Sequence, residues 1–528
     1  MSILDSTPKS SVRFLVGRRE ELLEVVRSVQ EHRITVVLGP RRIGKSSLVK
    51  TALVVLSGKE KLENIRLSAR FIPVYVDMWA IVATSRSSRL FFEHLNNAIL
   101  RSLEDHDKTL ADKYKTRMYK VEELYARESS IEKIIKIGTK REQLYKYPVD
   151  ILRCVDEFND VLTKHNRKAV LAVDEAQELG TLKPFIPTAW LAHIHDHATN
   201  MHILLSGSYV GLFKKILHPK PKDPLYGRDI RKINIGKLKP EALLTIFFEG
   251  LNERGVQPSP EIYGIVLKAV DILKPAIFAQ QIPFSNKSAQ ISIGAIITSK
   301  EAKRELEKKP LEARTSPEYM INLVETLIHV MSMTVLSLLQ SMLVYYSANL
   351  LMKIGFDINR FSITLPKETE KNISRFAELI TDPEFRIILI LSLFVLSGSP
   401  SLMISLAKNL PNRFTDEHLL ETGLHVLDES YKAVCNEINR FIESYSKKPE
   451  IIVDILYTLY SAPRTWSEIV QALSSQDVDK KSISENLKTL IELGYLEKFK
   501  EGAHIYYYIT DPLLFYALKE KCIGILKV

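Results

Sequence analysis

A short stretch near the N-terminus, GPRRIGKSS, carries the residue types that bind phosphate. Gly39 is followed, after four residues, by Gly44, Lys45 and Ser46. In this pattern backbone N–H groups surround the phosphate oxygens, the lysine reaches the terminal phosphates and the hydroxyl binds Mg²⁺. The preceding run ITVVL has the composition of a buried strand, and the following run SSLVKTALVVL has helical spacing. The stretch therefore predicts a strand, a phosphate-binding loop and a helix whose positive dipole end faces the anion.

The whole stretch is expected to line the phosphates of a nucleotide. Its members are Gly39, Pro40, Arg41, Arg42, Ile43, Gly44, Lys45, Ser46 and Ser47. The two arginines occupy variable positions of the pattern, so we assign them no catalytic role. A glycine-rich turn with solvated basic side chains is the alternative, and the strand in front of the loop disfavours it.

Two carboxylates that could complete an ATPase follow a second apolar run, in KAVLAVDEAQ. The run predicts a strand ending in Asp174 and Glu175. In sites of this kind the first acid holds Mg²⁺, and the second orients and deprotonates the attacking water. Strand ends with two acids are common, and it is the phosphate loop upstream that makes this one informative.

A third predicted strand, NMHILLSGSY, ends in polar residues, among which Ser208 could sense the terminal phosphate. The segment DPLYGRDIRKINI follows, and its Arg228 is a candidate for the arginine that stabilises transition-state charge, in its own or a neighbouring subunit. An arginine on a solvated surface, without a catalytic role, is an alternative with equal support.

Taken in order, FLVGRREELLEVV, GPRRIGKSS, VYVDMW, LAVDEAQ, LLSGSYVGL and PLYGRD resemble the archaeal ATPase family. The family belongs to the signal-transducing (STAND) branch of the P-loop ATPases, close to the origin-recognition type of AAA+ proteins. The resemblance implies that Gly17 and Arg18 lie beside the adenine and the ribose. The family's box Gly-Arg-Glu-x-Glu departs here at its third position, which is Arg19.

The resemblance also implies a helical lid with a Gly-Gly-x-Pro signature that contacts the nucleotide. FVLSGSPSLMISLAK keeps Gly398 and Pro400 and fits better than DILKPAIFA, which keeps only a proline. We therefore expect Pro400 to lie near the nucleotide.

The expected organisation has four parts. They are a P-loop core at residues 1–255, a mainly helical insertion at 256–382, a helical lid at 383–446 and a winged-helix domain at 447–528. Within the core, residues 103–147 are charged and helical in pattern, and we expect a solvated helical pair there.

Composition is that of a soluble globular protein, with 45% apolar and 26% charged residues. The three cysteines lie far apart in sequence, so we expect buried thiols in a cytoplasmic protein and neither a disulfide framework nor a zinc site. The formal net charge is +10, and residues 211–240 carry much of the excess. Their basic residues are Lys214, Lys215, Lys220, Lys222, Arg228, Arg231, Lys232, Lys237 and Lys239, against Asp223 and Asp229.

Two apolar stretches raise the question of a membrane. Residues 327–352 (LIHVMSMTVLSLLQSMLVYYSANLLM) are uncharged over a length that could cross a bilayer, and residues 387–407 are nearly as apolar. Several polar side chains interrupt the first stretch, and Gly-Ser-Pro interrupts the second. Buried or partner-facing helices are therefore favoured, and the 256–382 insertion is a candidate surface for a protein partner.

Near the C-terminus, three short helical patterns precede YLEKFKEGAHIYYYIT, which has the alternation of a hairpin. Three helices and a hairpin make a winged helix, and the family commonly carries one at this end. Its third helix offers candidate DNA contacts, which are Lys480, Lys481, Ser484, Asn486 and Lys488. Residues 447–528 hold eleven basic and eleven acidic residues, however, so a protein contact is about as well supported.

The sequence thus predicts an α/β P-loop (AAA+-like) ATPase with a helical lid, an insertion and a winged helix, using ATP and Mg²⁺. Hydrolysis would drive a conformational switch that is relayed to a partner, in a chain that could form oligomers. One rival is a DNA-binding loader that resembles the origin-recognition proteins. A second rival is a nucleotide-binding signalling scaffold with little turnover.

Overall fold

The structure is a computed structural model of the chain. The residues it describes are 2–5, 7–119, 148–183, 185–208, 212–256, 387, 390, 391, 394, 395, 397–445, 449–460, 464–474, 478–492, 495–501, 503–509, 511–519 and 522. Its contacts divide the chain into two compact units. We call Thr7–Gly236 the N-terminal unit, and Lys237–Val528 together with Met1–Ser6 the C-terminal unit.

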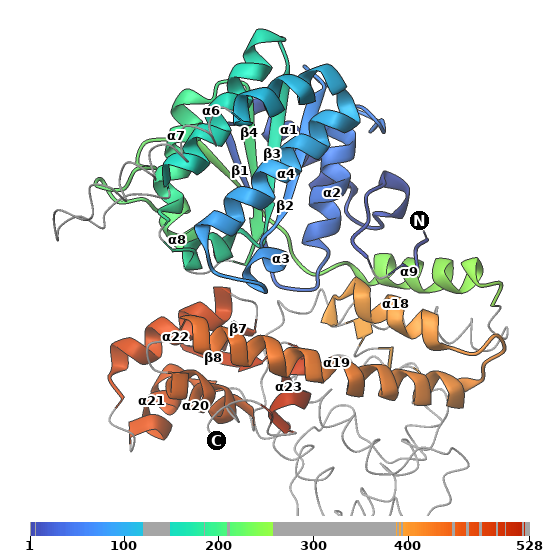
Figure 1. Cartoon of the computed structure of the whole chain (residues 1–528). Coiled ribbons are helices and arrows are strands. Elements are labelled where there is room, and N and C mark those ends of the chain that lie inside the picture. Colours follow the sequence, from blue (N-terminus) through green and yellow to red (C-terminus); the bar gives the residue numbers. More distant parts are fainter. Residues whose placement is uncertain are drawn as a thin grey trace, which may run out of the picture. The chain divides into compact units, whose positions relative to one another are not determined.

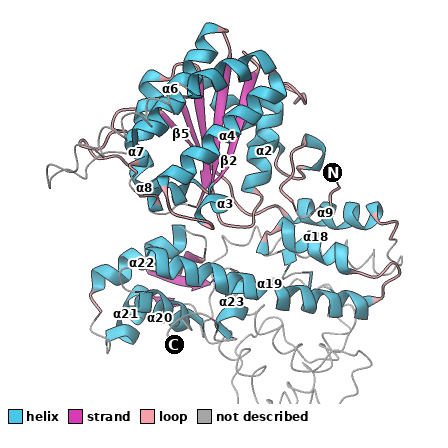
Figure 2. Cartoon of the chain, in the orientation of Figure 1, coloured by secondary structure: helices cyan, strands magenta, loops and turns pink. Residues whose placement is uncertain are grey.

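The N-terminal unit is built on a five-stranded parallel sheet with the order β2-β3-β4-β1-β5. The strands are β1 (Ile34–Leu38), β2 (Phe71–Asp77), β3 (Lys168–Asp174), β4 (Met201–Gly207) and β5 (Ile230–Asn234). Figure 2 shows them as one layer between helices. The central strands β1, β3 and β4 are mainly apolar and are buried along almost their whole length, because helices cover both of their faces. The predicted α/β class, a parallel sheet flanked by helices, is confirmed.

Helices on the two faces of the sheet complete two separate apolar cores (Figure 1). α1 (Arg19–Glu31) and α2 (Lys45–Leu56) contribute to one core, and α4 (Ser88–His106), α6 (Pro148–Lys164) and α7 (Pro187–His197) to the other. Because successive strand residues point to opposite faces, Val36 and Val37 lie in different cores. The shorter elements of this unit are η1 (Val12–Phe14), α3 (Met78–Val82), η2 (Ala176–Thr181) and α8 (Leu212–Leu217).

The solvated helical pair expected at residues 103–147 is corrected for the part that the structure describes. Residues 108–119 are helical, and Tyr114 within them is fully buried in the core beside α4 and α6. Its hydroxyl donates to Asn96 Oδ1 at 2.9 Å and contacts Cys154 Sγ at 2.9 Å. Burial raises the pKa of the Cys154 thiol to about 12, so this cysteine is the buried thiol that we predicted. The amphipathic spacing of Leu110, Tyr114 and Met118 in the sequence carried this signal.

Cys435 and Cys522 are not free thiols as predicted, because the structure joins them in a disulfide with Cα atoms 5.8 Å apart. The two residues are 87 positions apart in sequence, and sequence separation says nothing about distance in the fold. The bond links the long helix α19 (Asp416–Tyr445) to the segment that follows α23 (Pro512–Lys519). Disulfides of this kind are typical of oxidising compartments and of hyperthermophile proteins.

The C-terminal unit begins with α9 (Pro240–Glu253), which packs against α18 (Pro400–Asn409). We expected residues 240–253 to belong to the P-loop core, and the contacts of α9 group it with the C-terminal unit. Gly398 has a φ of +65°, and a Cβ there would lie 2.4 Å from the Lys237 side chain, so this position requires glycine. Ser399 then caps α18, and Pro400 occupies its first turn, where a proline costs no hydrogen bond.

The last part of the chain, which we call the C-terminal module, contains the three predicted helices and the predicted hairpin. They are α20 (Pro449–Tyr460), α21 (Trp466–Leu473), α22 (Lys480–Glu492), β7 (Leu496–Glu501) and β8 (His504–Ile509). A two-residue strand, β6 (Arg464–Thr465), pairs with β8 and was not predicted. Thr465 and Glu468 form a capping box that starts α21.

The 256–382 insertion beyond residue 256, including the apolar stretch 327–352, lies outside the described residues, as do residues 120–147. Within the part of the chain that the structure describes, none of the helices is both long enough and apolar enough to span a bilayer.

Candidate nucleotide-binding site

The phosphate-loop stretch connects β1 to α2, as predicted, and its backbone curls through left-handed conformations. Arg42 has a φ of 64° and Gly44 a φ of 93°. Left-handed residues in such a turn direct successive N–H groups toward a common point, where an anion can bind. Gly39 is required by close packing, since a Cβ there would lie 2.4 Å from the Ile235 carbonyl oxygen. The loop geometry is therefore that of an anion site at a helix N-terminus.

Lys45 is the first residue of α2, and only 4% of it is exposed. Its Nζ donates to the Pro40 carbonyl oxygen at 2.7 Å, so the Lys45 side chain reaches from the end of the loop back to its beginning. This position puts the positive charge inside the loop.

Parallel pairing brings the predicted acids to the same edge of the sheet as the loop. Leu38, which ends β1, pairs with Gly207, and Asp174 pairs with Asp77 at the end of β2. β4 lies between β1 and β3. The carboxyl edge of the sheet thus presents the loop, the end of β4 and the acids side by side, where ligands of open α/β sheets bind.

Asp174 is a buried carboxylate, 2% exposed, held by two hydroxyl groups. Tyr75 OH donates to Oδ2 at 2.9 Å, and Ser206 Oγ donates to Oδ1 at 2.5 Å. Burial, followed by the negative charge of Asp174, raises the pKa of Tyr75 well above its ordinary value, so its hydroxyl stays protonated and donates. The two hydroxyls fix the orientation of this carboxylate.

Glu175 follows in a left-handed conformation, with a φ of 51°, which is uncommon for a residue with a side chain. The side chain is partly exposed, unlike that of Asp174. Its Oε2 accepts from Gln177 Nε2 at 2.5 Å. Because of this backbone conformation, the two neighbouring acids lie in different environments: Asp174 is buried, and Glu175 can be reached by water.

The polar residues at the end of β4 have different partners. Ser206 is engaged with Asp174. Ser208 is 1% exposed, and its Oγ has no hydrogen-bond partner within the described chain. A buried hydroxyl without a partner costs free energy and points to a ligand. The Ser208 hydroxyl therefore suits the predicted sensing of a phosphate better than the Ser206 hydroxyl, which already donates to Asp174.

The residues present fit a magnesium ion. Ser46 lies in the first turn of α2 and is partly exposed, and Asp174 supplies a hard carboxylate. Mg²⁺ is usually held by one or two protein oxygens together with phosphates and waters, not by a cage of side chains. The described residues contain no cluster of three or more His, Cys, Asp or Glu side chains suited to a metal.

Arg18, predicted beside the ribose, is buried and supports the loop from behind. Its Nη2 donates to the carbonyl oxygens of Ile43 (2.9 Å) and Gly236 (2.6 Å), and its Nη1 pairs with Glu21 at 2.7 Å. Arg18 thus pairs with Glu21, the last residue of the box, while the box departs at Arg19. Gly17 precedes it with a φ of 71°.

Two further residues of the predicted phosphate segment have partners outside the loop. Ser47 Oγ accepts from the backbone N–H of Lys9 at 3.0 Å and so ties the N-terminal segment to α2. The Arg41 guanidinium lies over the Trp79 ring, 5.3 Å from its centroid, which is a cation–π contact. These contacts give both residues a structural explanation.

Arg228 lies away from the phosphate loop. It precedes β5, whose first residue, Ile230, is level with Ile34, whereas the loop follows the other end of β1. A five-residue strand spans about 16 Å. The guanidinium is bound to Asp196, with Nε donating to Oδ1 at 3.0 Å, and the hydrogen bonds from Arg228 hold the pKa of Asp196 well below its usual range. This placement leaves a neighbouring subunit as the place where Arg228 could reach a phosphate, and that role stays a prediction.

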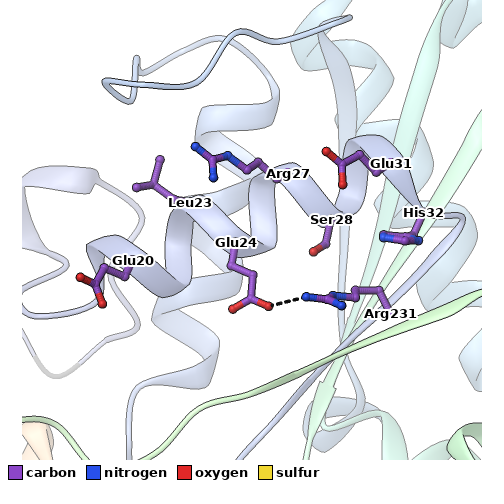
Figure 3. Close-up of a pocket in the computed structure, with 8 residues that line it drawn as sticks. All are labelled: Glu20, Leu23, Glu24, Arg27, Ser28, Glu31, His32 and Arg231. Carbon is purple, nitrogen blue, oxygen red and sulfur yellow. Dashed lines mark hydrogen bonds and ion pairs between the residues drawn. The ribbon is translucent and has the colours of Figure 1, made fainter.

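A surface pocket of about 530 Å³ lies between α1 and β5 (Figure 3). Its lining is Glu20, Leu23, Glu24, Arg27, Ser28, Glu31, His32 and Arg231. Glu24 and Arg231 are paired across it at 3.1 Å. None of the predicted site residues lines this pocket, and its lining has three glutamates, two arginines and one histidine.

The roles of Tyr75, Ser206 and Gln177, which hold the two acids, were not predicted. VYVDMW was noted only for its resemblance to the family and NMHILLSGSY as a strand with a polar end, and only the pairing of β2, β3 and β4 shows which side chains meet. Pro400 belongs to the C-terminal unit, and its contact with the nucleotide stays a prediction.

Comparison with known proteins agrees with this geometry. A family model described as an ATPase domain predominantly from Archaea matches residues 15–267. This segment is an ATPase domain of the archaeal family. The predicted resemblance is confirmed, and the ATPase domain is a nucleotide-binding one. No curated protein matches the chain.

Among solved structures, the Walker-type ATPase PABY2304 of Pyrococcus abyssi is similar over 98% of this chain and 99% of that chain, with 15% identity and a TM-score of 0.51. That likeness shows a shared fold. The ORC2 protein of Aeropyrum pernix, in ADPNP–ADP complexes, has a TM-score of 0.45 at 11% identity, covering 98% of this chain and 97% of its own. Cdc6p of Pyrobaculum aerophilum has a TM-score of 0.31 at 11% identity, covering 98% of both chains.

Proposed function

We propose that the chain is a Mg²⁺-dependent ATPase whose hydrolysis cycle drives a conformational switch. One observation carries the proposal: the phosphate loop with Lys45, the buried Asp174, the accessible Glu175 and the unpartnered Ser208 hydroxyl gather at one edge of the sheet. Phosphoryl transfer needs little covalent chemistry from the protein, so catalysis rests on positioned charges of this kind.

In this proposal the protein groups divide the work. Lys45 holds the β and γ phosphates, and the loop N–H groups neutralise the remaining charge. Ser46 and Asp174 hold Mg²⁺, which would supply charge neutralisation at the phosphates. Glu175 orients the attacking water and accepts its proton, while Ser208 senses the γ phosphate.

The wider organisation belongs to the same proposal. The core, the 256–382 insertion, the lid and the C-terminal module act as distinct parts, and the lid passes the state of the nucleotide to the C-terminal module. A protein partner binds through the insertion or the module, and Arg228 serves a neighbouring subunit if the chain forms oligomers. A cytoplasmic location is part of this proposal.

Removal of the metal tests the proposal. Chelation of Mg²⁺ with EDTA is expected to bring phosphate release to background. An Asp174→Asn variant is expected to need at least tenfold more Mg²⁺ for half-maximal hydrolysis, since even outer partners of metal ligands contribute about 10- to 100-fold in affinity. The measurement is phosphate release over a Mg²⁺ titration.

The matched control is Asp105→Asn, which changes an exposed acid at the end of α4. Its Mg²⁺ titration should coincide with that of the unchanged protein. Coincidence of the Asp174→Asn curve with both of them would remove Asp174 from the metal site.

DNA binding is the second candidate function, and the exposure of three lysines on α22 favours it. Lys480, Lys481 and Lys488 are exposed, whereas two other predicted contacts are engaged within the module. Ser484 accepts from Trp466 Nε1 at 3.0 Å, and Asn486 donates to the Ser482 carbonyl oxygen at 3.0 Å. Any DNA contact would therefore be made mainly to phosphates, which confers little sequence specificity.

We expect weak, salt-dependent binding of duplex DNA, measured by fluorescence anisotropy. Changing Lys481 and Lys488 to alanine should reduce the slope of log affinity against log salt by about two, since each phosphate contact contributes about one. Absence of DNA binding at low salt would rule out this candidate and leave a protein as the only proposed partner of the C-terminal module.

A further inference from the structure

The carboxamide of Gln177 joins two parts of the site that the proposed function treats separately. Gln177 lies in η2, directly after the two acids, and is 2% exposed. Its Nε2 donates to Glu175 Oε2 at 2.5 Å. Its Oε1 accepts from the backbone N–H of Ser208 at 3.4 Å. One buried side chain thus links the proposed base to the residue proposed to sense the γ phosphate.

The end of β4 is shaped to admit this carboxamide. A Cβ at Gly207 would lie 2.1 Å from Gln177 Oε1, so a side chain there would displace the carboxamide from its present position. Gly207 has no positive φ, so its backbone does not require glycine. The present positions of the Gln177 carboxamide and of the Phe213 ring, 2.7 Å from the same point, therefore depend on the absence of a side chain at Gly207.

The direction of the two hydrogen bonds matters for the chemistry. Nε2 can only donate and Oε1 can only accept, so the carboxamide cannot rotate without losing both partners. The bond to Oε2 occupies one oxygen of Glu175 and leaves Oε1 of that carboxylate for water. A shift of the Ser208 backbone would move the carboxamide and, with it, the Glu175 carboxylate.

We propose that Gln177 is a positioning residue that couples the end of β4 to the orientation of Glu175. Contact of the Ser208 hydroxyl with a γ phosphate is transmitted through the carboxamide, which sets the carboxylate against the attacking water. The inference rests on the proposed function, in which Glu175 is the base. It adds a route by which occupancy of the γ-phosphate position controls the base.

The test uses the full chain with Gln177→Met, which approximately keeps the volume and removes both hydrogen bonds. We expect kcat to fall by about tenfold, because small misplacement of a reacting group costs up to about a hundredfold. KM and the affinity for ADP should stay within about twofold, since the loop is untouched. The readouts are steady-state phosphate release, fluorescent-ADP binding and thermal melting.

Thr181→Val is the matched control, because it removes a different hydrogen bond of the same short helix, which Thr181 Oγ1 donates to the Glu178 carbonyl oxygen. It should leave kcat unchanged. An unchanged kcat in Gln177→Met would overturn the inference, as would a parallel loss of ADP affinity and melting temperature, which indicates a purely structural role.

Glu175→Gln separates this inference from the function on which it rests. If Glu175→Gln abolishes hydrolysis while Gln177→Met is as active as the unchanged chain, the coupling is wrong and the base assignment stands. If Glu175→Gln hydrolyses normally, the base assignment fails, and the inference about Gln177 fails with it.

Discussion

Replacement of Lys45 by alanine is expected to weaken ATP binding by roughly 100-fold and to remove hydrolysis with it. The ammonium group lies inside the loop, 4% exposed, and removal of one partner from a buried charged pair costs about 2–5 kcal/mol. Water cannot replace the group in so enclosed a position. Equilibrium binding of a fluorescent ATP analogue measures the loss, and circular dichroism checks that α2 remains folded.

Lys59→Ala is the control for charge alone. Lys59 is exposed just beyond the C-terminal end of α2, so its removal changes the net charge equally without touching the loop. Binding should be unchanged in this variant. Equal affinity of Lys45→Ala and the unchanged protein would mean that the nucleotide binds elsewhere.

Replacement of Glu175 by glutamine is expected to have the largest effect on turnover. Glutamine keeps the shape of the side chain but cannot accept a proton, and a positioned general base contributes about 10²–10⁴ in rate. ATP binding should be retained, because the loop and Lys45 are unchanged. Single-turnover phosphate release, with binding measured on the same sample, separates the two effects.

Glu20→Gln provides the matched change at an exposed acid of α1 and should hydrolyse ATP normally. A signalling scaffold with little turnover predicts a different pattern, in which the unchanged protein and both variants are equally slow. The comparison therefore also decides between the proposed ATPase and that rival.

Much of the N-terminal unit could be predicted from the sequence because its signals are local. The strand of Ile34–Leu38, the loop and α2 follow one another without interruption, and a strand ending in Asp174 is visible from its apolar run alone. Each of these elements is specified by residues within about ten positions. The phosphate-loop pattern is also specified by neighbouring residues, and its members are therefore recognisable in the sequence alone.

The supporting residues could not be predicted because they depend on register between strands. Tyr75 meets Asp174 from the neighbouring strand, and Ser206 meets it from the other side. Nothing within either segment signals the pairing. The Cys435–Cys522 bond was missed for the same reason, since it joins α19 to a segment 87 positions further along the sequence.

The placement of Arg228 illustrates a different limit. Because Arg228 follows the strand that ends near Ser208, we predicted an arginine near the phosphates. The chain, however, returns to the opposite edge of the sheet before β5 begins. Parallel topology then puts it at the amino edge, where Asp196 neutralises its charge. Strand direction, which is a property of the whole sheet, decided the outcome.

The most direct test of the central claim is the identity of the nucleotide held by Glu175→Gln after incubation with ATP and Mg²⁺. Rapid removal of free nucleotide, acid quenching and chromatography give the ratio of bound ATP to bound ADP. We expect predominantly ATP in this variant and predominantly ADP in the unchanged protein treated identically. Predominantly ADP in the variant would contradict the assignment of Glu175 as the base at the carboxyl edge of the sheet.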